Sequence, residues 1–164
     1  MRTLLLLFFL GFSALTLRAQ QLDFIGLKGV YFGMKSSDMA DKTVILDSTS
    51  SYKDTATYLR NTRCKMYFRN NENLSLSGFT ASRVEYEFCD NELGYVFVYV
   101  KGNAEIDKAI AELQKTFKKL GCKGRPLSQC TLMDASAKGM RVIVNIDRKK
   151  QEMNFVLIPK KAAR

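Results

Sequence analysis

Residues 83–121, which read RVEYEFCDNELGYVFVYVKGNAEIDKAIAELQKTFKKLG, predict the central unit of the fold: a strand, a turn, a second strand and a helix. In the first strand, apolar residues alternate with glutamates, in the order Val84, Glu85, Tyr86, Glu87 and Phe88. This period of two is typical of a strand with one face on a core and the other towards water. The DNELG segment that follows is rich in turn residues, with Gly94 free to adopt positive φ, so we expect an antiparallel hairpin.

The second strand of this hairpin, residues 95–100, has no polar face. It places three valines on one face and three aromatic residues on the other, namely Val96, Val98 and Val100 against Tyr95, Phe97 and Tyr99. Both faces of such a strand need to be covered. We therefore expect it in the middle of the sheet.

An amphipathic helix is predicted to follow the hairpin. Asn103 can act as its N-cap, because the side-chain oxygen can accept hydrogen bonds from first-turn amides, and Gly121 is the expected stop. Apolar residues recur at steps of three and four and form one stripe: Ile106, Ile110, Leu113, Phe117 and Leu120. Because an isolated helix of this length is marginal, we expect the stripe to pack across the apolar face of the hairpin.

The rest of the chain predicts more antiparallel strands. The expected elements are a short helix over residues 37–42, strands near 44–46, 55–60 and 64–69, a small-residue connection over 134–139, and a last hairpin with strands at 142–146 and 153–157. The predicted fold class is α+β. It consists of a mostly antiparallel sheet of five or six strands, one main amphipathic helix on one face and a short N-terminal helix.

Residues 1–19 have the parts of a secretory signal peptide. Arg2 lies in a short basic start, an apolar run covers residues 4–17, and Ala19 is a small residue at a cleavage point. A membrane anchor is disfavoured because the run is short for a hydrocarbon layer of about 30 Å. A lipoprotein is disfavoured because no cysteine follows the run. We expect residues 20–164 to form one periplasmic or secreted domain with a basic tail at 159–164.

Four cysteines remain after that cleavage, and an even number in a small exported domain predicts two disulfides of about 3 kcal/mol each. Cys122 and Cys130 bracket a loop that a local bridge can close, which leaves Cys64 with Cys89. If these two lie directly opposite each other in antiparallel strands, the neighbouring side chains match poorly, whereas a one-residue slip puts the cysteines on opposite faces. We keep this pairing and expect a bulge, an intervening strand or strong end-twist to reconcile it.

Two segments carry a resemblance to known domains. GVYFGMKSSDM at residues 29–39 and GFTASRVEYEFCDNEL at 78–93 resemble small secreted or periplasmic bacterial α+β domains of unknown function, which have the same order of hairpin, helix and closing hairpin. More distantly, the layout is similar to outer-membrane assembly lipoproteins and to β-lactamase inhibitor proteins. The chain lacks the lipidated cysteine and Leu-Gly-x-Pro of the former and the tandem repeat of the latter. The resemblance therefore implies a fold and transfers no catalytic residue.

Several kinds of chemistry are excluded or disfavoured by the composition. The chain has no histidine, which excludes Ser-His-Asp and Cys-His schemes and histidine metal sites. Oxidised cysteines supply no thiolate nucleophile, and no glycine-rich phosphate loop follows a strand. The cysteines also suit zinc poorly, because they lack Cys-x-x-Cys spacing and are expected in an oxidising compartment. We expect no cofactor, no metal and no catalytic residue.

Glu85 and Glu87 share one strand face, so a glycosidase-like hydrolase with paired carboxylates is conceivable. The chain has no tryptophan to stack on a sugar. The favoured interpretation is a solvated face on which the glutamates pair with Lys65. The hydrolase is kept as the alternative function.

The first candidate binding surface is the aromatic row. Tyr95, Phe97 and Tyr99 are expected on one face, with Tyr67 flanking them beside Glu85 and Glu87. An uncovered row would form an apolar binding patch. The favoured interpretation is a row covered by the N-terminal segment or by a loop, because apolar rows at strand period are usually core.

The second candidate surface is the positive charge after the hairpin, carried by Lys115, Lys118, Lys119, Lys123, Arg125, Arg148, Lys149, Lys150, Lys160 and Lys161. If these residues gather at one end, they can bind an anionic glycan, a lipid head group or an acidic envelope protein, and Lys119, Lys123 and Arg125 are the candidate binding residues among them. The favoured alternative is a solvated basic surface. Nucleic acid is not expected, because no recognisable motif is present. The sequence thus predicts a non-enzymatic envelope or secreted binding module.

Overall fold

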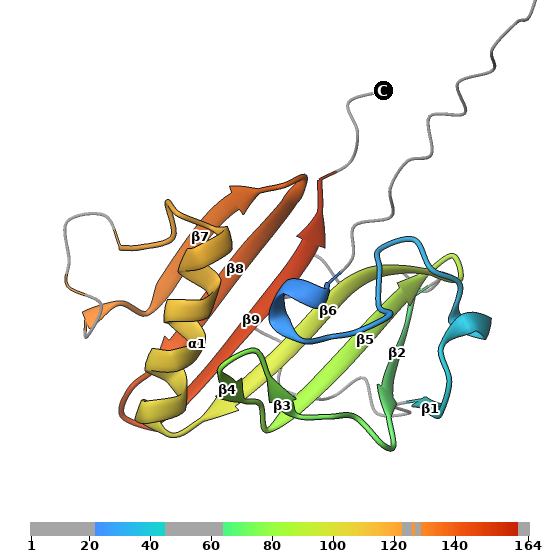
Figure 1. Cartoon of the computed structure of the whole chain (residues 1–164), viewed down its shortest axis with the longest axis horizontal. Coiled ribbons are helices and arrows are strands. Elements are labelled where there is room, and N and C mark those ends of the chain that lie inside the picture. Colours follow the sequence, from blue (N-terminus) through green and yellow to red (C-terminus); the bar gives the residue numbers. More distant parts are fainter. Residues whose placement is uncertain (1–21, 45–63, 123–125, 127–128, 161–164) are drawn as a thin grey trace, which may run out of the picture.

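The computed structural model describes residues 22–44, 64–122, 126 and 129–160. Its main element is a seven-stranded antiparallel sheet with the strand order β1-β2-β5-β6-β9-β8-β7 (Figure 1). The strands are β1 (Lys42–Val44), β2 (Cys64–Arg69), β5 (Arg83–Cys89), β6 (Glu92–Lys101), β7 (Leu132–Ala137), β8 (Met140–Asp147) and β9 (Glu152–Pro159). A small hairpin, one α-helix and two 3-10 turns complete the described part, namely β3 (Ser75–Leu76) with β4 (Phe79–Thr80), α1 (Asn103–Thr116), η1 (Asp23–Ile25) and η2 (Ser36–Asp38).

The α+β class is confirmed, but the sheet has more strands than the five or six predicted. The additional edge strand is β7, which covers most of the stretch predicted as a small-residue connection. It turns into β8 through Lys138 and Gly139, which both have positive φ. Small side chains lack the β-branched and aromatic signal on which strand prediction depends.

The β5–β6 hairpin is confirmed, and β6 is the middle strand of the sheet. Its turn is formed by Asp90 and Asn91, whose φ values of 52° and 67° fit a two-residue turn of type I′. The prediction that Gly94 supplies the positive φ is wrong. Gly94 lies within β6, where the register shifts between Glu87 and Phe88, and thus belongs to a β-bulge.

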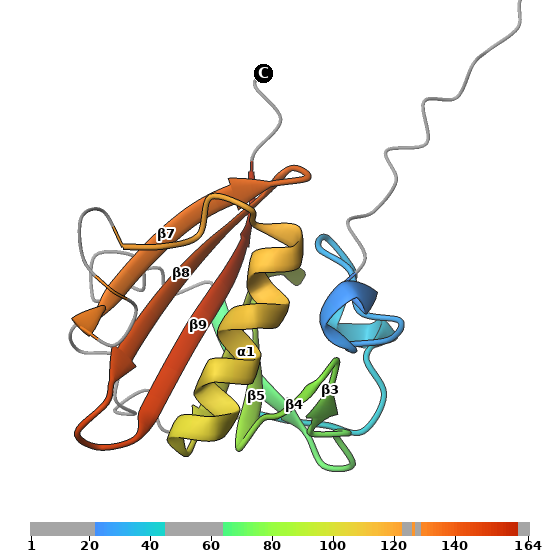
Figure 2. The same cartoon turned by 60° about the vertical axis from the view of Figure 1, so that its left-hand side comes forward.

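The helix α1 lies across one face of the sheet, as predicted (Figure 2). It contacts β6, β9, β4 and η1. Its buried residues are Ile106, Ala109, Ile110 and Leu113. The predicted stripe continues past the end of the helix, because Phe117 and Leu120 are also buried. Packing against the sheet, rather than intrinsic propensity, therefore stabilises this 14-residue helix.

The ends of α1 differ from the prediction. Gly102 occupies the N-cap position without a side-chain hydrogen bond, and Asn103 is the first helical residue. At the other end Phe117 is the C-cap residue, and its backbone amide donates to the Leu113 carbonyl. This C-cap lies four residues before Gly121, the predicted stop. The residue at the C-cap is therefore the buried Phe117 and not a glycine.

The face of the sheet beneath α1, called here the helix face, carries the main core. Strand alternation places on it the side chains of Val84, Tyr86, Phe88, Val96, Val98, Val100, Phe155 and Leu157. The N-terminal residues Leu22, Ile25, Leu27 and Val30 join the same core. The N-terminal segment therefore covers the helix face, and the expectation that it covers the aromatic row on the other face is wrong.

The predicted N-terminal helix over residues 37–42 is not confirmed. The chain forms the three-residue 3-10 turn η2 instead, none of whose residues is buried. Without an apolar stripe a short helix has nothing to pack against. Of the predicted strand at 44–46, Val44 is observed as the last residue of β1, and residues 45 and 46 lie outside the described residues. The predicted signal peptide, the predicted strand at 55–60 and residues 161–164 of the tail lie outside the described residues.

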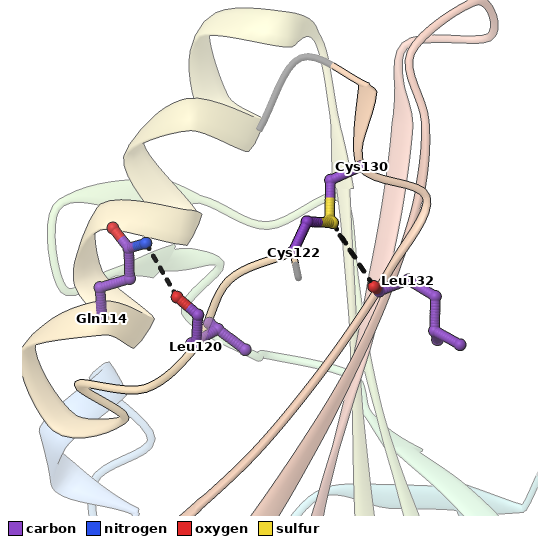
Figure 3. Close-up of a disulfide and its surroundings, with 5 residues drawn as sticks. All are labelled: Gln114, Leu120, Cys122, Cys130 and Leu132. Carbon is purple, nitrogen blue, oxygen red and sulfur yellow. Dashed lines mark hydrogen bonds between the residues drawn. A yellow bond between two sulfur atoms is a disulfide. The ribbon is translucent and has the colours of Figure 1, made fainter. Parts of the chain in front are cut away.

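Both predicted disulfides are confirmed. The bridge between Cys122 and Cys130 ties the segment after α1 to the start of β7, and Gln114 donates a hydrogen bond of 3.1 Å to the Leu120 carbonyl beside it (Figure 3). Cys64 lies directly opposite Cys89, and Met66 opposite Glu87, in the register of β2 and β5.

No slip in that register is needed to form the second bridge. The bulge lies between β5 and β6 instead. The poor match that the sequence indicated between Met66 and Glu87 is therefore real.

Candidate functional site

The face of the sheet turned away from α1, called here the opposite face, carries both glutamates of β5. Glu85 is 1% exposed and Glu87 is 4% exposed. The prediction of a solvated acidic face paired with Lys65 is therefore wrong. Lys65 is exposed and lies opposite Phe88 in the register. Alternation on β5 identified the face of each glutamate correctly but not whether that face meets water.

Glu85 is held by two neighbours on its own face. The Arg83 guanidinium lies 2.8 Å from one carboxylate oxygen, and the Tyr99 hydroxyl donates to the other at 2.8 Å. The Arg83 guanidinium also stacks over the Tyr99 ring, 4.5 Å from its centroid. Burial raises the pKa of Glu85, and the positive charge of Arg83 partly opposes this. These three side chains form a connected unit, which we call the Arg83–Glu85–Tyr99 cluster.

Glu87 has a different environment. It lies between Met66 of β2 and Tyr95 of β6 in the sheet register, next to the bridge between Cys64 and Cys89. One of its carboxylate oxygens, Oε2, is buried without a hydrogen-bond partner among the described residues. Burial raises the pKa of Glu87 from 4.5 to about 7. This side chain can therefore hold a proton close to neutral pH.

The aromatic row lies on the opposite face as predicted, but it is not a flat exposed patch. Phe97, 4% exposed, packs with Val156 in a small second core, and Tyr95 and Tyr99 are half-buried around it. The Tyr95 and Phe97 rings stack with centroids 6.4 Å apart. The row is mainly a packing surface whose polar edge is the Tyr99 hydroxyl.

Tyr67 was predicted to flank this row beside the glutamates, and the structure places it elsewhere. It lies opposite Tyr86 in the register, is buried on the helix face and meets Phe88 edge-on at 5.4 Å. The direct pairing of Cys64 with Cys89 dictates this placement, because a one-residue change of register would turn the side chain over. Tyr67 is a core residue.

A cavity of about 570 Å³ opens where β5 begins and β6 ends. The Arg83–Glu85–Tyr99 cluster borders it through Arg83 and Tyr99, whereas neither glutamate of β5 lines it. Asn145 of β8 and Asn154 of β9 also line it, and their side-chain amides hydrogen bond to each other at 3.2 Å. The cavity thus presents amides, a phenol and a guanidinium from four different strands.

The charged groups around this cavity are paired. Lys101 lies 3.6 Å from Glu152, and Lys150 lies 3.6 Å from Asp147. The remaining cation that lines it, Arg83, is neutralised by Glu85 beneath it. The cavity therefore offers many hydrogen-bonding groups and little net charge.

Sequence reasoning missed this cavity. The available signal was an asparagine in each strand of the last hairpin, on the face that alternates with the core residues, namely Asn145 in MRVIVNID and Asn154 in EMNFVLIP. Their meeting depends on the register of β8 against β9, which places them directly opposite each other.

The basic residues do not gather at one end of the described structure. Arg148 lies at the start of α1, where it pairs with Asp107 at 2.7 Å, whereas Lys118 and Lys119 follow the end of the helix and are exposed. A helix of 14 residues separates these two groups by about 21 Å. Arg148 therefore does not share one basic surface with Lys118 and Lys119. Lys123, Arg125 and Lys161 lie outside the described residues.

The chain matches no family model, no curated protein and no solved structure. In the described residues, none of the helices has the length and apolar character needed to cross a membrane.

Proposed function

We propose that the protein is an exported, non-enzymatic binding module of the cell envelope or the secreted fraction, and that the opposite-face cavity is its binding site. Two features support export: the signal-peptide pattern of residues 1–19 and the two disulfides. The observation that carries the binding role is the cavity itself. Its Arg83 and Tyr99 walls are fixed in advance by the buried Glu85, and groups held in place before binding lose little entropy on association.

The charge balance favours a hydroxyl-rich ligand, such as an envelope glycan, over a lipid head group or an acidic protein. Each cation that lines the cavity has an acidic partner, so little field is left to attract an anion. The side-chain amides of Asn145 and Asn154 can both donate and accept hydrogen bonds, as sugar hydroxyls require. The Tyr99 hydroxyl donates its proton to Glu85 and can accept a hydrogen bond from a sugar hydroxyl. The class of ligand that we propose is therefore a neutral glycan.

Calorimetric titration with soluble envelope glycan fragments tests this proposal. Replacing Asn154→Leu removes a polar wall group while keeping the side-chain size, and should weaken binding about tenfold, the equivalent of one lost hydrogen bond of about 1.4 kcal/mol. The matched control is Ser136→Leu on β7, which is exposed and does not line the cavity. Glycan binding that is missing in the parent protein, or equal in both variants, would refute the proposed site.

The alternative function, a hydrolase acting through acidic residues, has one observation in its favour. Glu87 has its pKa raised to about 7, and a carboxylic acid protonated near neutral pH can serve as a general acid. Against it, Glu85 is already engaged by Arg83 and Tyr99, and neither glutamate lines the cavity. Hydrolysis of a glycoside or ester that is lost in a folded Glu87→Gln variant would establish the enzyme and overturn the non-enzymatic role.

A further inference from the structure

The bridge between Cys64 and Cys89 and the Glu87 carboxylate form a compact group of metal-ligating side chains. One sulfur from each cysteine and one carboxylate oxygen all lie within 4.8 Å of one another. The sequence gives no sign of this group, because the cysteines are 25 positions apart and no Cys-x-x-Cys spacing is present. The register of β2 and β5 brings them together, since it places Cys64 opposite Cys89 and Met66 opposite Glu87.

A second observation points to a cation at this place. Glu87 is 4% exposed, and its Oε2 atom has no hydrogen-bond partner in the described part of the chain. A buried carboxylate oxygen without a partner is costly, and a bound metal ion is one of the few groups that would satisfy it. Both cysteines are partly exposed, unlike Glu87 between them in the group.

We propose that reduction of the bridge between Cys64 and Cys89 creates a zinc site whose ligands are the two thiolates and the Glu87 carboxylate. A dithiol reductant supplies two electrons and two protons to the bridge, which becomes two thiols while the reductant becomes a disulfide. When Zn²⁺ binds, the two thiols lose their protons to solvent. With three protein ligands, the tetrahedral ion keeps one open position for water.

The arrangement suits zinc. Zn–S bonds of about 2.3 Å and Zn–O bonds of about 2.0–2.2 Å bring tetrahedral donors to roughly 3.3–3.8 Å from each other, which small side-chain rotations reach from the observed arrangement. Two soft thiolates disfavour calcium and magnesium. In the oxidised protein the sulfurs are bonded to each other, so metal binding is restricted to the reduced form.

The test uses the full chain with Cys122→Ser and Cys130→Ser, so that the remaining cysteine pair is Cys64 with Cys89. Equilibrium dialysis against Zn²⁺, with a phosphine reductant that binds zinc weakly, should give one zinc per reduced chain and none per oxidised chain. Adding Glu87→Gln should lower zinc affinity by more than about tenfold, since even outer-shell partners of a zinc site contribute that much. Cobalt in place of zinc should show the intense absorption of tetrahedral thiolate coordination.

The matched control retains the other pair, with Cys64→Ser and Cys89→Ser. It should bind zinc far more weakly after reduction, because Cys122 and Cys130 belong to no such ligand group among the described residues. If reduction unfolds the chain, zinc must restore the folded circular dichroism spectrum, since metal binding is then coupled to folding. The proposal is refuted by a reduced chain that binds no zinc, by a zinc affinity that Glu87→Gln leaves unchanged, or by equal affinity in the control.

Discussion

The helix face and the opposite face of the same sheet are built on different principles. Beneath α1 the buried side chains are apolar apart from the hydroxyl groups of Tyr67 and Tyr86, and they belong to one large cluster that includes the N-terminal segment. The opposite face has a small apolar cluster around Phe97 and Val156. It also carries Glu85 and Glu87, the two buried acidic residues of the described chain.

The apolar residues of the helix face stabilise the fold, whereas the buried glutamates of the opposite face are not needed for packing. Burying a carboxyl group costs free energy, and an apolar residue of similar size would pack on the opposite face without that cost. Neither of the two buried acidic residues of the described chain lies on the helix face. The ionisable groups of Glu85 and Glu87, together with the neighbouring cavity, therefore support our proposal that binding takes place on the opposite face.

The largest expected effect comes from the apolar cores themselves. Phe155 is fully buried in the large cluster, whereas Phe97 lies in the small one. Phe155→Ala should lower the free energy of unfolding by about 3–5 kcal/mol. Phe97→Ala should lower it by less, because fewer apolar side chains pack around the Phe97 ring. Urea denaturation of both variants measures the two costs. Equal losses would show that the two faces contribute alike to stability.

The next effect is the pH dependence of stability, which we expect from the buried glutamates of the opposite face. The pKa of Glu87 is about 7 in the folded protein and 4.5 ordinarily, so between these pH values the unfolded chain ionises first and is favoured. Stability should therefore fall as pH rises from 4.5 to 7, by at most about 3 kcal/mol. The raised pKa of Glu85 acts in the same direction.

Glu87→Gln isolates this contribution. The variant should match the parent protein at pH 4.5 and exceed its stability at pH 8, as measured by thermal unfolding in a series of buffers. The pKa values of Glu105 and Asp147 are lowered, so these two groups make stability rise with pH. They titrate below pH 4.5 and therefore do not affect the comparison between pH 4.5 and pH 8. A parent protein that gains stability between pH 5 and pH 7 would contradict a buried, protonated Glu87.

The helix face was largely predictable from the sequence, because the patterns that form it each lie within one continuous segment. Alternation in β5 and β6 and the three- and four-residue steps of α1 each lie within one continuous stretch, and packing followed from them. The turn was less predictable, since Asp90 and Asn91 adopt the positive φ that glycine was expected to supply. Local pattern identifies an element better than it identifies the residue that ends it.

The opposite face was not predictable, because its properties depend on register and covering. Alternation shows that Glu85 and Glu87 share a face, but only tertiary structure decides whether that face is exposed to solvent. Tyr67 was assigned to the wrong face because a single residue of register changes its side. Asn145 and Asn154 meet only when β8 and β9 are paired. Each of these properties depends on how segments distant in the sequence pack together, and the pattern within one segment does not predict that.

The smallest predicted effect compares two tyrosines, one on each face, that donate to a glutamate. Tyr99 donates to Glu85 at 2.8 Å, and Tyr86 donates to Glu72 at 2.5 Å. Tyr99→Phe should cost about 1–2 kcal/mol in urea denaturation, because it leaves a carboxylate oxygen of Glu85 without its donor in a buried place. Tyr86→Phe should cost a similar amount.

Ligand binding separates these two variants where stability does not. Tyr99 lines the cavity, so Tyr99→Phe should also weaken glycan binding several-fold, whereas Tyr86 lies on the helix face and Tyr86→Phe should leave the affinity unchanged. The comparison is informative because both changes remove one hydroxyl group that donates to a carboxylate. If both variants lost affinity equally, binding would depend on overall stability, and the division between a structural face and a functional face would fail.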